Sequence, residues 1–316
     1  MITTRLGVLA TTLSASLAGP VAAQEEGVTI GVSIPAATHG WTGGLNYHAE
    51  RTVAAMEEAF PNIDIILETS ADVGEQVSDV EDLRVQGIDA LVILPFESDP
   101  LTEPVKAATE AGVFVTTVDR GLGEEGIEDL YVGGNNPEYG RIAARYFREK
   151  LPEGGQIVVM RGIPTAIDNI RIEAFQAELE GSGIEILDME HANWNPDQGF
   201  ELMQDYLARF ERIDGVWAGD DDAALGARAA IEQAGREGEM ALLGGSGMNT
   251  VIKGIMDGDA LIDADIFYPP TIIVPAIELT VMRYATQAPI QGEYVLDSPL
   301  ITQENAAEYY FPDSPY

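Results

Sequence analysis

The chain has 316 residues, and 46% of them are hydrophobic, which is enough for two domains with a core each and excludes a disordered protein. It carries 53 Asp and Glu against 17 Lys and Arg, a formal net charge of −36. A surface this acidic repels phosphate groups, so nucleic acid is excluded as an expected partner. There is no cysteine, which excludes disulfides.

The first predicted element is an export signal at residues 1–23. Arg5 is the charged residue of this segment, small apolar residues follow it, and Val21 and Ala23 occupy the small-residue positions of a cleavage site. The apolar stretch is too short to span a membrane, and no later run is long enough. We expect cleavage before Gln24 and a periplasmic protein without a lipid anchor; a disordered apolar N-terminus is the alternative.

Strand and helix patterns alternate along the rest of the chain. Continuous apolar runs predict strands, and residues such as Leu45, Ala49 and Val53 recur at helical spacing between two of them. The predicted strands cover residues 28–34, 63–68, 89–95, 113–118, 156–160, 184–189, 214–219 and 240–244. Apolar strands that alternate with amphipathic helices predict an α/β protein whose parallel sheets are covered by helices on both faces.

An internal similarity predicts two lobes. Residues 87–112 and 212–235 share the order Ile-Asp, buried strand, acidic turn, helix and Ala-Gly, although any two βαβ units share part of this pattern. Glycines and prolines mark three candidate crossings between the lobes, near residues 131–140, 263–273 and 294–302. The prediction is an N-terminal lobe of residues 24–133 plus 268–296 and a C-terminal lobe of residues 134–267 plus 297–316, joined by a three-stranded hinge.

Polar and aromatic side chains follow the predicted strands. Ligands of open parallel sheets bind beyond the carboxyl ends of the strands, so these side chains are candidates for a binding site. The candidates are His39, Trp41, Asp119, Arg120, Asp168, Asn169, Trp194, Asp220, Ser246 and Phe267. Carboxylate, guanidinium and amide groups form two-pronged hydrogen bonds with hydroxyls, and aromatic faces pack on C–H groups, which predicts a sugar ring between Trp41 and Trp194.

Several candidates have a structural alternative. Asp168 and one of the acids at 220–222 also fit the caps of the helices that follow them. A single Trp is more often a core residue, His39 fits a turn equally well, and Arg171 is interpreted as tying its helix to the lobe instead of contacting ligand. Trp217 lies within a strand and is assigned to the core.

Six segments in order resemble one protein family. They include the first-strand corner with its aromatic residues, VDRG (118–121), NNPEYGRIAA (135–144), the segment with DNIRIEAF, WNPDQGFELMQDYL (194–207) and DDDAALGARAAIEQAG (220–235). The chain resembles the periplasmic sugar-binding proteins of ribose/galactose type that serve ABC importers. The resemblance implies the type I periplasmic binding protein fold, with two Rossmann-like lobes that close on one sugar by hinge motion.

The resemblance also implies roles for single residues. Asp119 and Arg120 match the pair that grips ring hydroxyls, while Trp41, with His39, and Trp194 match the aromatic contacts. Asn169 falls where ribose binders tend to have Arg, and Asp220 falls where Asn is common. Ser246 falls where Asp is usual and Phe267 near a usual Gln. These departures put specificity for ribose alone in doubt and leave pentoses, hexoses and small polyols open.

The expected function is that of the exported binding component of an ABC importer. Because Asp119, Asp168 and Asp220 outnumber Arg120 near the cleft, a neutral or amino sugar is expected and a sugar acid is not. The expected partners are this small sugar or polyol and an ABC permease, with a chemoreceptor as a further option; we expect a monomer, no cofactor and no metal. The alternatives are a binding protein for another polar solute and an exported hydrolase, for which no nucleophile or zinc motif is found.

Overall fold

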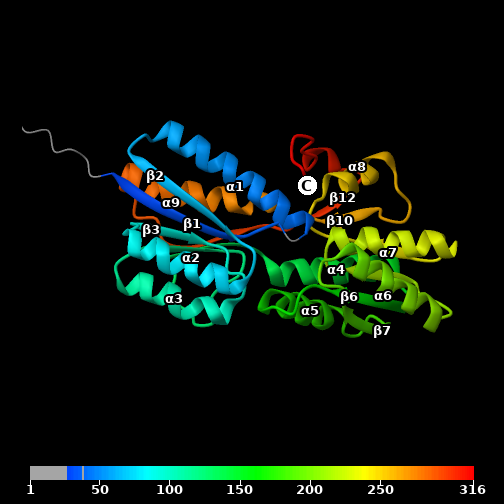
Figure 1. The fold of residues 1–316 in the computed structure, drawn as a ribbon. Coiled ribbons are helices and arrows are strands. Elements are labelled where there is room, and N and C mark those ends of the chain that lie inside the picture. Colours follow the sequence, from blue (N-terminus) through cyan, green and yellow to red (C-terminus); the bar gives the residue numbers. More distant parts are fainter. Residues whose placement is uncertain (1–26, 38) are drawn as a thin grey trace, which may run out of the picture.

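The computed structural model describes residues 27–37 and 39–316, and Figure 1 shows two lobes side by side. The predicted export signal lies outside the described residues. In the part of the chain that is described, no helix is long and apolar enough to cross a membrane.

The first lobe is built on a six-stranded sheet in which every neighbouring pair is parallel, in the order β11-β5-β4-β3-β1-β2. Its strands are β1 (Val28–Pro35), β2 (Ile63–Ser70), β3 (Ala90–Ile93), β4 (Phe114–Val118), β5 (Leu130–Gly134) and β11 (Gly292–Leu296). One face is covered by α1 (Gly40–Ala59) and α9 (Ile273–Thr286), the other by α2 (Val73–Gln86) and α3 (Ser98–Glu110).

The second lobe is built on a four-stranded parallel sheet in the order β7-β6-β8-β9. Its strands are β6 (Gly155–Arg161), β7 (Ile184–His191), β8 (Gly215–Ala218) and β9 (Ala241–Leu243). The pair α4 (Asn136–Lys150) and α5 (Ala166–Leu179) packs on one face, and the pair α6 (Pro196–Arg209) and α7 (Asp221–Ala234) packs on the other. The prediction of parallel sheets covered by helices is therefore confirmed.

An antiparallel ladder of two short strands, whose pairing the sequence did not predict, completes the second lobe. It pairs β10 (Ala264–Ile266) with β12 (Leu300–Thr302) and packs beside α8 (Asn249–Asp257). A short 3₁₀ helix follows each strand of this ladder in the chain: η1 (Pro270–Ile272) follows β10, and η2 (Ala306–Glu308) follows β12.

Three segments lead from one sheet system to the other. β5 is followed by α4, β10 is followed by η1 and α9, and β11 is followed by β12. The assignment of these elements to the two sheets agrees with the lobe limits predicted from the sequence. These limits stay a proposal.

The hydrophobic core is continuous between the lobes. One cluster of buried side chains contains residues of both, among them Trp41 of α1, Tyr268 after β10 and Trp217 of β8. Trp217 is 1% exposed and its ring centroid lies 4.3 Å from that of Phe175, so its assignment to the core is correct.

Close packing of α6 on α7 depends on glycine. A Cβ atom at Gly226 would collide with the carbonyl oxygen of Pro196, and a Cβ atom at Gly199 would lie 2.5 Å from the carbonyl oxygen of Ala223. Because both obstacles are backbone atoms, the helices would have to separate to accept a larger residue.

We therefore expect Gly226→Ala to lower the free energy of unfolding by about 1–3 kcal/mol, although Ala has the higher helix propensity. Gly238→Ala is the matched control, because no atom lies within 4 Å of its added Cβ. Urea unfolding of both variants checks this, and an equal stability of the two would contradict the packing argument.

Candidate functional site

A cavity lies between the lobes at the carboxyl ends of the strands. It encloses about 340 Å³ of space that protein atoms do not fill, part of it open to solvent. It is lined by His39, Trp41, Asp119, Arg120, Ile167, Arg171, Trp194, Asp220, Ser246 and Tyr268. The structure thus brings together seven of the ten residues predicted for the site, and Asp168, Asn169 and Phe267 are the three outside it.

Asp119 and Arg120 directly follow β4 and are both buried. Asp119 has a φ of 58°, a left-handed conformation that its carbonyl oxygen helps to hold by accepting a hydrogen bond of 2.8 Å from the Tyr131 hydroxyl. Arg120 Nη1 donates to the carbonyl oxygens of Pro95 (3.2 Å) and Phe96 (2.8 Å). Its Nε lies 3.8 Å from Asp119 Oδ2, too far for a hydrogen bond, and has no other partner among the described residues.

Arg171 of α5 is a buried cation at the back of the cavity. Its guanidinium lies over the rings of Tyr139 and Tyr268, 4.2 and 4.4 Å from their centroids, and its Nε donates to Asn136 Oδ1 at 2.7 Å. The Tyr268 hydroxyl in turn donates to Asp119 Oδ1 at 2.5 Å. Burial, with Asp119 beside it, raises the pKa of Tyr268 well above its usual range, so the hydroxyl keeps its proton.

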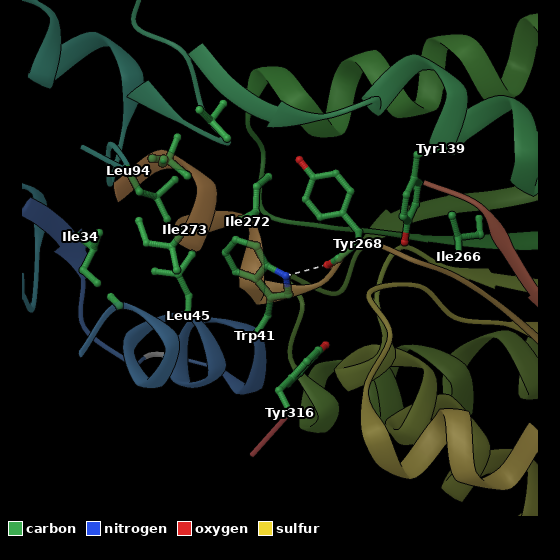
Figure 2. Packing of buried hydrophobic residues seen from close by; sticks show 14 of the residues in the cluster. Ile34, Trp41, Leu45, Leu94, Tyr139, Ile266, Tyr268, Ile272, Ile273 and Tyr316 are labelled. Carbon is green, nitrogen blue, oxygen red and sulfur yellow. Dashed lines mark hydrogen bonds between the residues drawn. The ribbon is translucent and has the colours of Figure 1, made fainter. Parts of the chain in front are cut away.

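Three aromatic side chains form the apolar wall. The ring of His39 lies 6.5 Å from that of Trp41, nearly parallel to it, and 6.0 Å from that of Trp194. Trp41 Nε1 donates to the carbonyl oxygen of Tyr268 at 2.9 Å, which Figure 2 shows as a dashed line. His39 is thus in ring contact with indoles of both lobes, and the sandwich of a ligand by Trp41 and Trp194 stays a prediction.

His39 is a neutral group at pH 7. Burial is the main cause that lowers its pKa to about 4, and the positive charge of Arg120 acts in the same direction. Its Nδ1 is buried and has no hydrogen-bond partner among the residues that the structure describes. The imidazole can therefore offer one donor or one acceptor to a ligand, according to its tautomer.

Asp220 begins α7 and has two different oxygens. Oδ1 accepts a hydrogen bond of 3.0 Å from the Ala223 backbone N–H, so the predicted capping role is real. Oδ2 is buried and has no hydrogen-bond partner within residues 27–37 and 39–316. Burial, then the neighbouring Asp222, raises the pKa of Asp220 to about 8. A protonated Asp220 offers a donor as well as an acceptor, as an Asn side chain does.

A buried carboxyl pair holds the loop that carries Ser246. Asp221 accepts from the backbone N–H groups of Gly245 (3.0 Å) and Met248 (2.8 Å), and Asp265 accepts from that of Gly247 (3.0 Å). The two carboxyls also hydrogen-bond to each other, and burial raises the pKa of both. Ser246 itself has a φ of 120°, so this clamp stabilises a backbone conformation that side-chain-bearing residues rarely adopt.

Asp222 connects the second lobe to the first. Its carboxylate lies beside the backbone N–H groups of Gly40 and Trp41, the first residues of α1, and its Oδ2 forms no hydrogen bond of standard geometry with a described residue. These N–H groups have no partner inside the helix, and the helix N-terminus favours a negative charge. A Cβ atom at Gly40 would lie 2.9 Å from both carboxylate oxygens, so this contact requires glycine.

The structure places Asp168 and Asn169 outside the cavity. Both oxygens of Asp168 are used within the second lobe, one by Arg161 Nε at 2.8 Å and Nη2 at 2.5 Å, the other by the Gly162 N–H at 2.9 Å. Asn169 Oδ1 accepts from the same Arg161 at 2.6 Å and lies at a wider cleft beside the cavity. Asp168 is therefore not among the residues that line the cavity, because Arg161 and the Gly162 N–H occupy its carboxylate, and its predicted contact with a ligand stays a prediction.

Phe267 also lies away from the cavity. Its ring packs in the second lobe, 4.8 Å from the ring of Tyr309, whereas the next residue, Tyr268, lines the cavity. From the sequence, Phe267 was chosen over its neighbour Tyr268, Ile167 was not considered, and Arg171 was assigned to a structural role. The signal for Arg171 was its place one helical turn after Ile167, on the same face of α5.

The cavity is less acidic than the sequence suggested, and because the pKa of Asp220 is raised to about 8, this carboxyl is mostly protonated at pH 7. Arg120 and Arg171 line the cavity together with Asp119 and Asp220, whereas Asp168 lies outside it. The excess of acids that predicted a neutral ligand is therefore not found. No three His, Asp or Glu side chains within residues 27–37 and 39–316 are grouped to hold a metal ion.

Comparison with known proteins identifies the family. Residues 30–273 match the periplasmic binding protein domain, and the chain belongs to this family. The family resemblance and the type I periplasmic binding protein fold predicted from the sequence are confirmed.

Three similar proteins indicate the breadth of the family. The chain is 28% identical to the D-ribose/D-allose-binding protein of Pseudomonas aeruginosa over 207 aligned residues. The aligned part is 64% of this chain and 65% of that protein, so the chain spans just under two thirds of the length of this relative. It is 26% identical to the xylitol-binding protein of Mycolicibacterium smegmatis, over 96% of this chain and 87% of that protein. The solved fructose binding periplasmic domain of a hybrid two component system has a TM-score of 0.79 and 26% identity, with 89% of this chain and 92% of that chain covered.

We expect Asp220 to make stability depend on pH. The folded chain holds this proton up to a pH of about 8, whereas an unfolded Asp releases it near 3.8, so the free energy of unfolding should fall as the pH rises between these values. Asp220→Asn should remove this contribution, at most about 1.4 kcal/mol per pH unit. Urea unfolding of both proteins from pH 4 to 9 measures it, and parallel curves would exclude Asp220 as a source.

Proposed function

We propose that the chain is the exported substrate-binding component of an ABC importer and binds a neutral monosaccharide or small polyol in the cavity between its lobes. The carrying observation is a small cavity in which unpartnered buried donors and acceptors face three aromatic side chains from both lobes. The family is one of binding proteins, which favours this function over the hydrolase alternative.

The polar atoms of the cavity suit hydroxyl groups. Arg120 Nε needs an acceptor, Asp220 Oδ2 is free to accept or, when protonated, to donate, and His39 Nδ1 can do either. A hydroxyl donates and accepts at once, so a polyhydroxyl compound can satisfy all three atoms. Leaving one of them buried and unpaired costs about 1–3 kcal/mol, which would give selectivity for the arrangement of hydroxyls.

The contacts that the arginines of the cavity already make favour a neutral ligand over an anionic one. Arg171 already has two aromatic faces and Asn136, and Arg120 already has two carbonyl oxygens. A sugar acid would have to displace these contacts or leave its own charge uncompensated in a largely closed space. Similar proteins are described as binding ribose or allose, xylitol and fructose, all of which are neutral.

Delivery to a permease completes the proposal. The three crossing segments would act as a hinge, the lobes would close on the ligand, and the closed form would dock on a membrane permease. Periplasmic location rests on the predicted export signal and on the family. A chemoreceptor is a second option, because one similar structure belongs to a hybrid two component system.

The test of this proposal is a thermal-shift screen of the chain from Gln24 onward against D-ribose, D-allose, D-fructose, xylitol, myo-inositol and D-glucuronate. A compound that binds the native state raises the melting temperature by mass action. We expect one or a few neutral compounds to raise it and D-glucuronate to leave it unchanged. A shift with D-glucuronate alone would refute the neutral ligand, and no shift with any of the six compounds would favour the other-solute alternative.

Arg120→Ala should weaken binding of the compound found in this screen by at least tenfold, because it removes a buried charged donor. Arg141→Ala is the matched control, since Arg141 is half-exposed on α4 and pairs with Glu138 away from the cavity. Calorimetric titration measures both variants. Equal affinity in both would remove Arg120 from the site.

A further inference from the structure

The last described segment, residues 311–316, runs along the gap between the lobes. Figure 1 shows the C-terminal end of the chain between α1 and α8, and Figure 2 shows Tyr316 near Trp41 and the second lobe. The segment follows η2 of the second lobe but makes contacts with both lobes. We call it the strap.

The strap is anchored on the second lobe by one side chain. Asn249, the first residue of α8, donates from Nδ2 to the carbonyl oxygens of Phe311 and Ser314, at 2.7 Å each. Its Oδ1 accepts from the Phe311 backbone N–H at 3.2 Å. The amide of Asn249 therefore fixes the strap at two points along its length.

The strap is also bound to the first lobe through α1. The Tyr47 hydroxyl donates to the carbonyl oxygen of Asp313 at 3.1 Å, and His48 Nε2 lies 3.1 Å from Ser314 Oγ. Neighbouring residues of one helix thus contact the strap, while α1 itself packs on the six-stranded sheet and α9. Any movement that separates the lobes must break these contacts or the contacts with Asn249.

Tyr316 fills a notch in α1 that two glycines create. A Cβ atom at Gly40 would lie 2.9 Å from the Tyr316 ring, and one at Gly44 would lie 2.8 Å from the Tyr316 Cβ. The side chain is 4% exposed and belongs to the core cluster that contains Trp41. Four residues apart, Gly40 and Gly44 lie on the same face of the helix, so the notch is a feature of the helix sequence.

Tyr316 also reaches the edge of the cavity. Its hydroxyl is buried near Ser246 and close to the carboxyl groups at the start of α7, and it has no hydrogen-bond partner of standard geometry. Ser246 lines the cavity, and Asp222 of the same acidic group lies against Gly40 at the start of α1, next to His39 and Trp41. The strap therefore ends where the aromatic wall of the first lobe meets the polar wall of the second.

We propose that the strap of residues 311–316 latches the two lobes together and that Tyr316 is a positioning residue, which holds the start of α1 against the second lobe around the ligand cavity. This inference rests on the proposed function, since a latch has a role only where the lobes open and close. The strap would then set the equilibrium between the open and the closed arrangement of the lobes. It follows that a shorter chain still forms both lobes but favours the open form.

The test uses the absence of cysteine in the chain, which allows a pair of labels at Glu58→Cys on α1 and Glu237→Cys after α7, both exposed. The distance between the labels is measured without ligand in the labelled parent, in a variant that ends at Tyr310, and in Tyr316→Ala. We expect the ratio of open to closed molecules to rise roughly tenfold in the two variants, the effect of losing two or more hydrogen bonds or a buried ring.

Two further variants guard against indirect effects. Tyr47→Phe combined with His48→Gln weakens the strap contacts on α1 without shortening the chain, and it decides the question where the shorter chain does not fold. Tyr294→Phe removes a half-exposed tyrosine hydroxyl far from the strap and should match the parent. Unchanged distances in the shortened, Tyr316→Ala and double variants would overturn the latch.

A titration of the unlabelled parent with D-ribose, D-allose, D-fructose and xylitol separates this inference from the proposed function. Binding by the parent together with faster ligand release from Tyr316→Ala supports the latch. Binding with the same release rate in both proteins overturns it. The distance measurement needs no ligand, so a parent that binds none of these compounds would contradict the proposed function and leave the latch to be decided by the distances.

Discussion

The buried guanidinium of Arg171 is the constraint on which the arrangement of the site depends. A cation taken out of water must be compensated, and here the compensation comes from the rings of Tyr139 and Tyr268 and from Asn136. Asn136 and Tyr268 belong to two different crossings between the lobes, and Tyr268 is bound in turn to Asp119 of the first lobe. The guanidinium of Arg171 therefore holds together one wall of the cavity and two of the three segments that cross between the lobes.

The first helix shows how small residues let two lobes approach. Gly40 makes room for Asp222 and the ring of Tyr316, and Gly44 makes room for Tyr316 and Pro270. Any larger residue at either position would push α1 away from the second lobe and take His39 and Trp41 with it. The glycines that surround a histidine and a tryptophan in the first strand-to-helix corner thus position the aromatic wall.

Much of the fold was predictable because buried parallel strands have a local signature, a continuous apolar run. The β10–β12 ladder was not, because its three-residue strands are too short for any periodicity. At the site, the sequence did not show which side chains point into the cavity. Successive residues of an extended segment point to opposite sides, so sequence alone did not decide between Phe267 and Tyr268. The position of Asp168 outside the cavity was not predictable, because its partner, Arg161, is recognisable only in three dimensions.

The most direct measurement is a crystal structure of the chain from Gln24 onward, grown with the neutral sugar or polyol that gives the largest thermal shift. We predict one ligand molecule in the cavity, with hydroxyls on Arg120 Nε and Asp220 Oδ2 and a C–H face on His39, Trp41 or Trp194. A ligand bound elsewhere, or one in the cavity that leaves Arg120 and Asp220 unpaired, would contradict it.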